Sequence, residues 1–148
     1  MIRRVLVGVD FSTASREALA KGAAWAARLG VPLEVLHVIE LPRYPTGSPY
    51  AALGDPGWFK ELRPQAEARL KDWAAPYPGA SWSVETGHPA EAITERADRD
   101  TLIVVGQIGH SRLEHLLFGS TAVRVARHAP GDVLVVRAPV QDAPHAAE

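Results

Sequence analysis

The 148-residue sequence contains no cysteine, no asparagine and one methionine, which is its first residue. Without cysteine, disulfides, thiol catalysis and thiolate zinc sites are excluded. Depletion of these residues, together with 12 prolines, is typical of a heat-adapted protein. A biased genomic composition that favours Ala, Arg, Gly and Pro predicts the same pattern, so both interpretations stay open.

The sequence also lacks an excess of one charge and a long apolar run. Its 16 Lys and Arg residues offset 17 Asp and Glu residues, and no basic cluster resembles a nucleic-acid or membrane surface. No apolar segment reaches the roughly 20 residues of a membrane span. Asp10 interrupts the apolar start, and no signal-peptide cleavage site follows it. We therefore expect a cytoplasmic protein that binds neither nucleic acid nor membrane.

Strand and helix patterns alternate along the chain. Apolar or alternating runs predict strands over residues 5–10, 33–39, 81–86, 102–105 and 133–136, and helical spacing fills most of the segments between them. This order predicts one doubly wound α/β domain over residues 1–138, with a five-stranded, mainly parallel, Rossmann-like sheet flanked by helices. The strand over 81–86 has one polar face and is expected at an edge. Residues 139–148 are expected to form a disordered tail.

Several local signals refine this prediction. Ser12 or Thr13 is expected to cap the first helix, and Gly30 to end it. Pro64 predicts that the second helix is kinked or starts late. Residues 41–57, rich in Pro and Gly, form either a lid or a solvated insert. One apolar stripe is predicted for the first helix, made of Ala18, Leu19, Gly22, Trp25, Ala26 and Leu29.

The most specific motif is a set of spaced glycines near the C-terminus. Gly106 and Gly109 follow an apolar strand, and Gly119 precedes Ser120 and Thr121, where a helix is expected. Glycine lets the backbone approach a ligand closely, and the start of a helix offers free N–H groups and hydroxyls to an anion. The motif therefore predicts a phosphate site.

Asp10 ends the first predicted strand and has two possible roles. If the first and fourth strands are neighbours, its carboxylate faces the glycine motif and can accept a ribose hydroxyl or hold Mg²⁺. Alternatively, Asp10 only caps the helix that follows it. His37, in an apolar strand, is expected to be a hydrogen-bonded core histidine, and the four tryptophans are expected to be core or interface anchors.

Over almost its whole length the sequence resembles the universal stress protein family, in the branch that binds ATP. The resemblance rests on Val5–Ser12, Leu36–Ile39, Gly87-His88-Pro89 with Ile93, Leu102–Gly109, Gly119–Pro130 and Val133–Arg137. It implies a five-stranded parallel sheet, ATP across the ends of the first and fourth strands, and a homodimer formed through the last strand.

The resemblance also implies a role for each matching position. Gly106, Gly109, Gly119, Ser120 and Thr121 would line the phosphates, Asp10 would serve ribose or magnesium, and Gly8, Val9, Val38 and Val105 would form the adenine and ribose walls. His110 and Arg112 could reach a phosphate as cations, or could be solvated loop residues.

Two further observations shape the functional hypotheses. Gln107 and Ile108 stand where the family usually has a small hydroxyl and a basic or imidazole side chain. No Gly-Lys-Ser/Thr closes the glycine motif, and no general base for water attack is evident, so at most slow ATP hydrolysis is expected. The main hypothesis is a regulatory module whose ATP occupancy is sensed through a dimer or a protein partner. The alternative is a structural or interaction protein of the same fold that binds no nucleotide.

Overall fold

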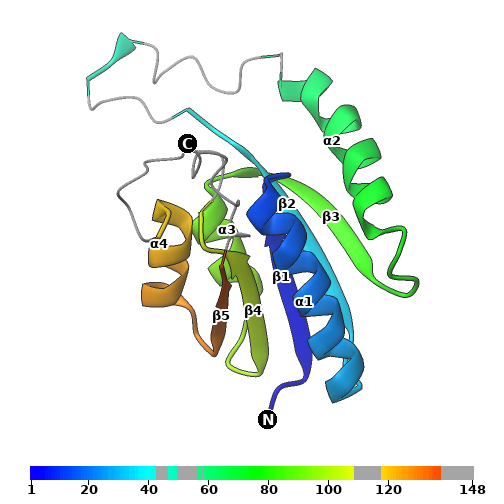
Figure 1. The fold of residues 1–148 in the computed structure, drawn as a ribbon. Helices are drawn as coiled ribbons and strands as arrows, with labels where there is room; N and C mark the ends of the chain where they lie inside the picture. Colours follow the sequence, from blue (N-terminus) through cyan, green and yellow to red (C-terminus); the bar gives the residue numbers. More distant parts are fainter. Residues whose placement is uncertain (43–46, 50–56, 58, 109–117, 138–148) are drawn as a thin grey trace, which may run out of the picture.

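Parallel strands form the centre of the fold (Figure 1). The computed structural model describes residues 1–42, 47–49, 57, 59–108 and 118–137. The strands of this part are β1 (Arg4–Val9), β2 (Leu33–Glu40), β3 (Ser81–Gly87), β4 (Thr101–Gly106) and β5 (Val133–Val136). They form one five-stranded sheet in the order β3-β2-β1-β4-β5, and every pair is parallel. The predicted sheet is therefore confirmed, and it is parallel throughout the described residues.

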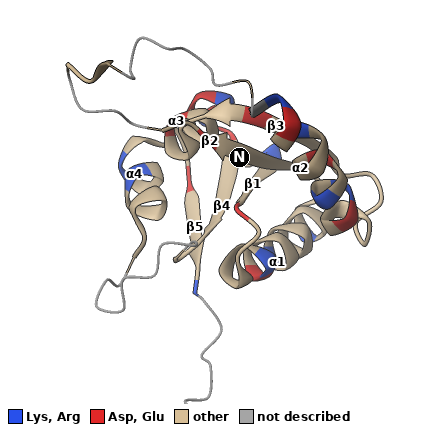
Figure 2. Cartoon of the chain, turned by 90° about the horizontal axis from the view of Figure 1, so that it is seen from above, with Lys and Arg blue, Asp and Glu red and all other residues tan. Residues whose placement is uncertain are grey.

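Helices cover both faces of this sheet. They are α1 (Thr13–Leu29), α2 (Phe59–Ala74), α3 (Pro89–Arg96) and α4 (Ser120–His128). The view from above shows α1 and α2 on one face and α3 and α4 on the other (Figure 2). Val5, Val7 and Val104 pack under α1 and α2, whereas Leu6 and Ile103 pack under α3 and α4. Burial on both faces explains why the central strands are continuous apolar runs.

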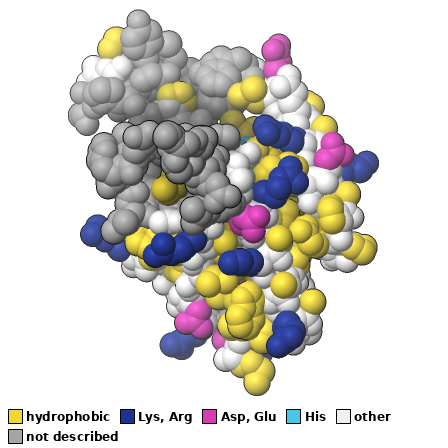
Figure 3. Space-filling view, in the orientation of Figure 1, with side chains coloured by type: hydrophobic (Ala, Val, Ile, Leu, Met, Phe, Trp, Pro, Cys, Tyr) yellow, Lys and Arg dark blue, Asp and Glu magenta, His cyan; other side chains and the backbone are white. Residues whose placement is uncertain are grey.

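The first helix has the predicted ends but a narrower apolar stripe. The Ser12 hydroxyl accepts a hydrogen bond from the Ser15 N–H at 3.2 Å, and Gly30 ends the helix with a φ of 67°. Two predicted stripe members are wrong, since Trp25 and Leu29 are 48% and 42% exposed. Small residues bring the helix close to the sheet, so the contact stays narrow. Hydrophobic side chains are accordingly visible on this face of the molecule (Figure 3).

Other local predictions have mixed outcomes. The α2 helix starts at Phe59 and includes Pro64, so the predicted late start is wrong. The edge position of β3 is confirmed, with Val84 buried and Ser81 and Thr86 exposed. Most of the 41–57 segment and the whole 139–148 segment lie outside the described residues, so the lid and tail predictions stay untested.

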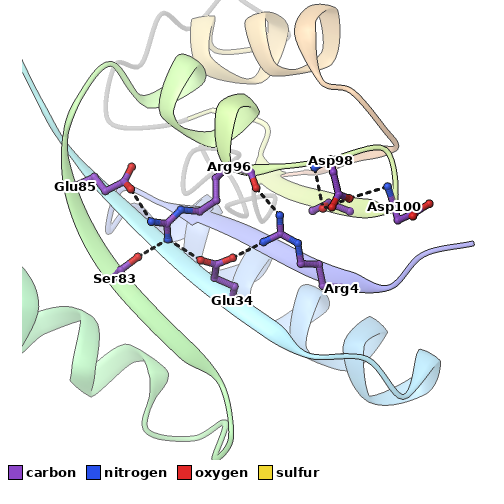
Figure 4. A network of polar contacts seen from close by, with 8 residues as sticks. Arg4, Glu34, Ser83, Glu85, Arg96, Asp98 and Asp100 are labelled. Carbon is purple, nitrogen blue, oxygen red and sulfur yellow. Dashed lines mark hydrogen bonds and ion pairs between the residues drawn. The ribbon is translucent and has the colours of Figure 1, made fainter.

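A polar network joins the end of α3 to the first strands (Figure 4). The Arg96 guanidinium donates to Glu34 at 2.6 Å, to Ser83 at 2.7 Å and to Glu85 at 2.6 Å. Arg4 donates to the second Glu34 oxygen at 2.8 Å and to the Arg96 carbonyl. One guanidinium thus connects α3 to both β2 and β3, which fixes this helix over the sheet.

The turn from α3 into β4 is stabilised by Asp98. Its carboxylate accepts hydrogen bonds from the Thr101 hydroxyl and the Asp100 N–H, each at 2.9 Å. These bonds, with the Thr101 bond contributing most, hold the pKa of Asp98 below its ordinary value. The turn therefore sets where β4 begins, beside β1.

Candidate functional site

The carboxyl ends of β1 and β4 meet at the point where the strand order reverses. Val7 pairs with Val104 in a parallel register, while β2 and β5 continue the sheet on opposite sides. In sheets of this kind, ligands bind at such a switch point. The two strands are neighbours, as the interpretation of Asp10 required.

A cavity of about 210 Å³ lies at this point. It lies between the strand ends and the first turns of α3 and α4. Its lining consists of Gly8, Val9, Asp10, Ser12, Ser15, Leu36, Val38, Glu40, Pro89, Ile93, Val105, Gly106, Gln107, Ile108, Gly119, Ser120, Thr121 and Ala122. The walls contributed by β2 and α3 are mostly apolar, and the α4 side is polar.

The lining contains most of the predicted site residues. Those brought together are Gly8, Val9, Asp10, Val38, Val105, Gly106, Gly119, Ser120 and Thr121. The predicted residues Gly109, His110 and Arg112 lie outside the described residues. Sequence reasoning missed Ser12, Ser15, Leu36, Glu40, Pro89, Ile93 and Ala122 as lining residues. The alternation of β2, which places Leu36 and Glu40 on the same face as the predicted residue Val38, is the signal that could have found two of them.

Asp10 belongs to a turn that is built from short-range hydrogen bonds. One Asp10 carboxylate oxygen accepts from the Ser12 N–H at 3.0 Å, and the Asp10 N–H donates to the Ser15 hydroxyl at 3.3 Å. The N-cap of α1 is Ser12, so the simple capping role considered for Asp10 is wrong. The turn holds the Asp10 carboxylate at the cavity.

Phe11, the next residue, has a left-handed backbone with a φ of 64°. Such a conformation is costly for a residue with a side chain and persists only where the surroundings impose it. The Phe11 ring packs against His37 with centroids 4.4 Å apart and against Trp73 at 5.2 Å. Arg69 covers the Phe11 ring at 4.5 Å. Packing on the α2 side therefore holds the turn in the shape that positions Asp10.

His37 supports the same turn from β2. Its Nδ1 donates a hydrogen bond to the Val9 carbonyl at 2.8 Å. The prediction of a hydrogen-bonded histidine is thus confirmed, although the ring is half-buried at the edge of the core. Trp73 fits the predicted anchor role because it is buried in the core, whereas Trp25 is exposed.

The start of α4 forms the polar wall of the cavity. Gly119 is the N-cap, and the Val123 N–H donates to its carbonyl at 3.2 Å. The preceding N–H groups, those of Ser120, Thr121 and Ala122, have no acceptor within the helix. Together with two hydroxyls and the positive end of the helix dipole, they form an environment that favours an anion.

Two glycines of the motif also have structural roles that the sequence did not predict. The Gly119 N–H donates to the Gln107 carbonyl at 2.7 Å, so it is not free to bind a phosphate. Gly106 has no left-handed φ. A Cβ on Gly106 would instead lie 2.9 Å from the Ala14 Cβ and 3.0 Å from the Ala14 carbonyl carbon. Gly106 is therefore required for close packing between β4 and α1.

Gly8 has a similar packing role on the opposite face of the sheet. A Cβ on Gly8 would lie 2.6 Å from Cδ1 of Ile93 and 3.5 Å from Cγ1 of Val105. Because Gly8 has no Cβ, α3 can approach β1, and this brings Ile93 and Pro89 to the cavity. Both glycines thus shape the cavity through the helices that they admit.

The family model described as the universal stress protein family matches residues 1–137. This chain belongs to the universal stress protein family. A universal stress protein of Mycolicibacterium smegmatis is 34% identical over 139 residues, which cover 90% of this chain and 45% of that protein. A putative universal stress protein of Staphylococcus epidermidis is 29% identical over 91% of this chain and 84% of its own length. This universal stress protein thus spans slightly less than half of its mycobacterial relative.

Solved structures show the same fold. The universal stress protein UspA from Lactobacillus plantarum has a TM-score of 0.68 and 26% identity, over 91% of this chain and 97% of that chain. A universal stress protein in complex with cAMP has a TM-score of 0.57 and 26% identity, over 92% and 97%. In the described part of this chain, no helix has the length and hydropathy needed to cross a membrane.

Proposed function

We propose that this universal stress protein binds an adenine nucleotide, ATP with Mg²⁺, in the cavity at the ends of β1 and β4. The observation that carries the proposal is the combination of an apolar slot with the free N-terminus of α4 in one cavity. A base needs apolar walls, and a phosphate chain needs N–H donors and hydroxyls.

The phosphates would lie against α4. The N–H groups of Ser120, Thr121 and Ala122 and the hydroxyls of Ser120 and Thr121 are the donors available for them. No Lys or Arg side chain lines the cavity among the described residues. Affinity would therefore depend on backbone donors, the helix dipole and the cation that accompanies the nucleotide, and we expect it to be modest.

The base and ribose would occupy the slot between β2 and α3. Leu36, Val38 and Ile93 form its apolar walls, and Asp10, which follows β1, is an acceptor for a ribose hydroxyl. The cavity volume, about 210 Å³, is below the roughly 300–1,000 Å³ of pockets that enclose a drug-sized ligand. The nucleoside would therefore fill the cavity, with its phosphates along the rim at α4.

Mg²⁺ would arrive with the nucleotide. Among the described residues, no group of three or more His, Asp or Glu side chains is arranged to hold a metal ion. Mg²⁺ bound to nucleotides commonly uses one carboxylate together with phosphate oxygens and water, and Asp10 is a carboxylate of this kind at the cavity. When bound, the ion would supply positive charge that no side chain of the described lining supplies.

Related structures support a nucleotide ligand. A universal stress protein of 26% identity was solved in complex with cAMP. The universal stress protein from Archaeoglobus fulgidus was solved in complex with dAMP. Both of these ligands are adenine nucleotides, which is the ligand class that we propose here.

We further propose that nucleotide occupancy, rather than hydrolysis, is the output of the protein. The sequence offers no evident base for water attack on a γ-phosphate, so little or no ATPase activity is expected. The bound state would be sensed in the cytoplasm by a second copy, paired through β5, or by another protein.

Heat release followed by titration tests this function. Freshly purified protein is denatured, and any released nucleotide is identified by chromatography. The emptied protein is then titrated with MgATP by calorimetry. Co-purified adenine nucleotide or saturable heat supports the proposal. If nothing is released and no heat appears at millimolar MgATP, the protein is better described as an interaction protein of the same fold.

A further inference from the structure

We propose that Glu40, the last residue of β2, selects the base by accepting a hydrogen bond from the 6-amino group of adenine. This inference rests on the proposed nucleotide site and assigns its base-recognition residue. Glu40 lines the cavity, and sequence reasoning did not identify it as a site residue.

The alternation of β2 directs the Glu40 side chain to the cavity. Val35 and Ile39 belong to the core under α1 and α2, whereas Leu36 and Val38 belong to the core under α3 and α4. Because side chains alternate along a strand, Glu40 shares the face of Leu36 and Val38. All three line the cavity, so β2 contributes two apolar walls followed by one carboxylate.

The neighbours of Glu40 leave its carboxylate open toward the cavity. Its cross-strand partner on β3 is Gly87, which has no side chain. Among the described residues, no ion pair or side-chain hydrogen bond of Glu40 is found. The nearest turn of α3 presents Pro89, which lacks an N–H donor, to the same cavity. Glu40 is therefore the polar group at this end of the described lining.

The charges at the two ends of the cavity fix the direction of a bound nucleotide. The α4 end attracts an anion, while a carboxylate at the β2 end repels one. Because β1 lies between β2 and β4, Glu40 is two strand spacings, about 10 Å, away from the end of β4 across the sheet. The phosphates then lie at α4, and the base lies beside Glu40.

The hydrogen-bonding character of Glu40 then selects the edge of the base. A carboxylate only accepts hydrogen bonds, so it favours a base edge that carries an amino group. The 6-amino group of adenine is such a donor. A purine without that group leaves the carboxylate without this partner, and hydrogen bonds to charged groups are among the stronger ones in proteins.

Removing the Glu40 carboxylate and the 6-amino group of the base, separately and together, tests the inference. MgATP and the Mg²⁺ complex of purine riboside 5′-triphosphate, which lacks the 6-amino group, are titrated by calorimetry into wild type and Glu40→Ala. We expect wild type to bind ATP about tenfold more tightly than the analogue, and Glu40→Ala to bind both alike. The ratio of dissociation constants cancels any general effect of removing a negative charge near a triphosphate.

Two further variants complete the design. Glu95→Ala removes the same charge from an exposed position on α3 outside the cavity lining, and we expect it to keep the wild-type ratio. Glu40→Gln keeps a neutral acceptor, and we expect an intermediate ratio of about threefold. Circular dichroism confirms that each variant is folded before it is titrated.

The outcomes separate the inference from the function on which it rests. If wild type binds both nucleotides equally, or if the ratio persists in Glu40→Ala, the role of Glu40 is wrong and the nucleotide site stands. Equal weakening of both nucleotides in Glu40→Ala points to a ribose contact and also overturns the inference. If wild type binds neither nucleotide, both proposals are overturned.

Discussion

Gly106 and Gly119 stand in one sequence motif but have different physical roles. Gly106 makes room for α1, because a Cβ there would meet the backbone and side chain of Ala14. Gly119 has a φ of −70° and a ψ of 161°, which any residue can adopt, and its N–H already bonds to Gln107. The backbone conformation of Gly119 thus does not require glycine, and its place in the cavity lining points to the ligand.

We expect Gly119→Val to abolish ATP binding while the protein remains folded. A branched side chain at the N-cap of α4 would occupy the space in which the phosphates approach the free N–H groups. Calorimetric titration should show no saturable heat at concentrations that saturate wild type, and Gly119→Ala should give an intermediate loss. A folded Gly119→Val protein that binds MgATP as tightly as wild type contradicts the phosphate site.

Gly106→Ala should instead destabilise the fold. The new Cβ would lie 2.9 Å from the Ala14 Cβ, so α1 has to shift, at a cost of about 1–3 kcal/mol in the free energy of unfolding. Urea denaturation measures this cost. Gly57→Ala is the matched control, because no described atom beyond its chain neighbours lies within 4 Å of its Cβ position, and it should be neutral or slightly stabilising. Equal stability of the two variants would show that α1 adapts without cost.

Prediction of single residues succeeded where the role of the residue depends only on its neighbours in sequence. Ser12 as a cap and Gly30 as a helix end follow from short-range hydrogen bonds and φ preferences, and both are confirmed. The left-handed backbone of Phe11 could not be predicted, because contacts with His37 and Trp73, distant in sequence, impose it. For the same reason Glu40 could not be predicted as a site residue, because its position at the cavity depends on which helices flank β2.

At the scale of elements, one arginine joins α3 to the sheet. Arg96 is 27% exposed and bridges two carboxylates, Glu34 and Glu85. In Arg96→Ala, Glu85 loses this ion pair, and Glu34 keeps only Arg4. We expect the free energy of unfolding to fall by about 2 kcal/mol, between the values typical of exposed and buried pairs.

Urea denaturation tests the network against a more exposed ion pair. Arg124 forms one ion pair with Glu91 at 3.4 Å, and its side chain is 46% exposed. Arg124→Ala should therefore lower the free energy of unfolding by no more than about 0.5 kcal/mol. If Arg96→Ala is as mild as Arg124→Ala, the network is a surface feature and does not hold α3 in place.

Elements were easier to predict than the contacts between them. Apolar runs gave the positions of β1, β2, β4 and β5 within a few residues, because parallel strands buried on both faces have little sequence ambiguity. The stripe of α1 was overestimated, since helical periodicity cannot show how wide a contact the sheet offers. The late start predicted from Pro64 was wrong, because α2 accommodates this proline in its second turn.

At the scale of the whole molecule, the two edges of the sheet differ in character. The edge strand β3 carries Ser81, Ser83 and Glu85 on one face and an exposed Thr86 on the other, which discourages pairing with another chain. The opposite edge strand, β5, is Val-Leu-Val-Val and is only partly buried within this chain. An apolar edge of this kind favours association, and we propose that β5 pairs with β5 of a second copy.

The hydrogen bonds of β5 show which of its backbone groups face the edge that no described strand covers. The Ile103 N–H donates to the Asp132 carbonyl, and the Gln107 N–H donates to the Val136 carbonyl. Because the backbone groups of a strand alternate in direction, residues 132, 134 and 136 face β4. The N–H and carbonyl groups of Val133 and Val135 therefore face away from the sheet, where a second copy would pair.

Val135→Pro should therefore separate the homodimer without breaking the sheet. Proline removes an outward N–H and places its ring at the open edge, which is the position in a sheet that tolerates proline. Size-exclusion chromatography with light scattering at micromolar concentration should give a dimer for wild type and a monomer for Val135→Pro. Val135→Thr, which keeps the N–H and the branched shape, should remain dimeric. A monomeric wild type would overturn the proposed homodimer, and a dimeric Val135→Pro would place the association elsewhere on the molecule.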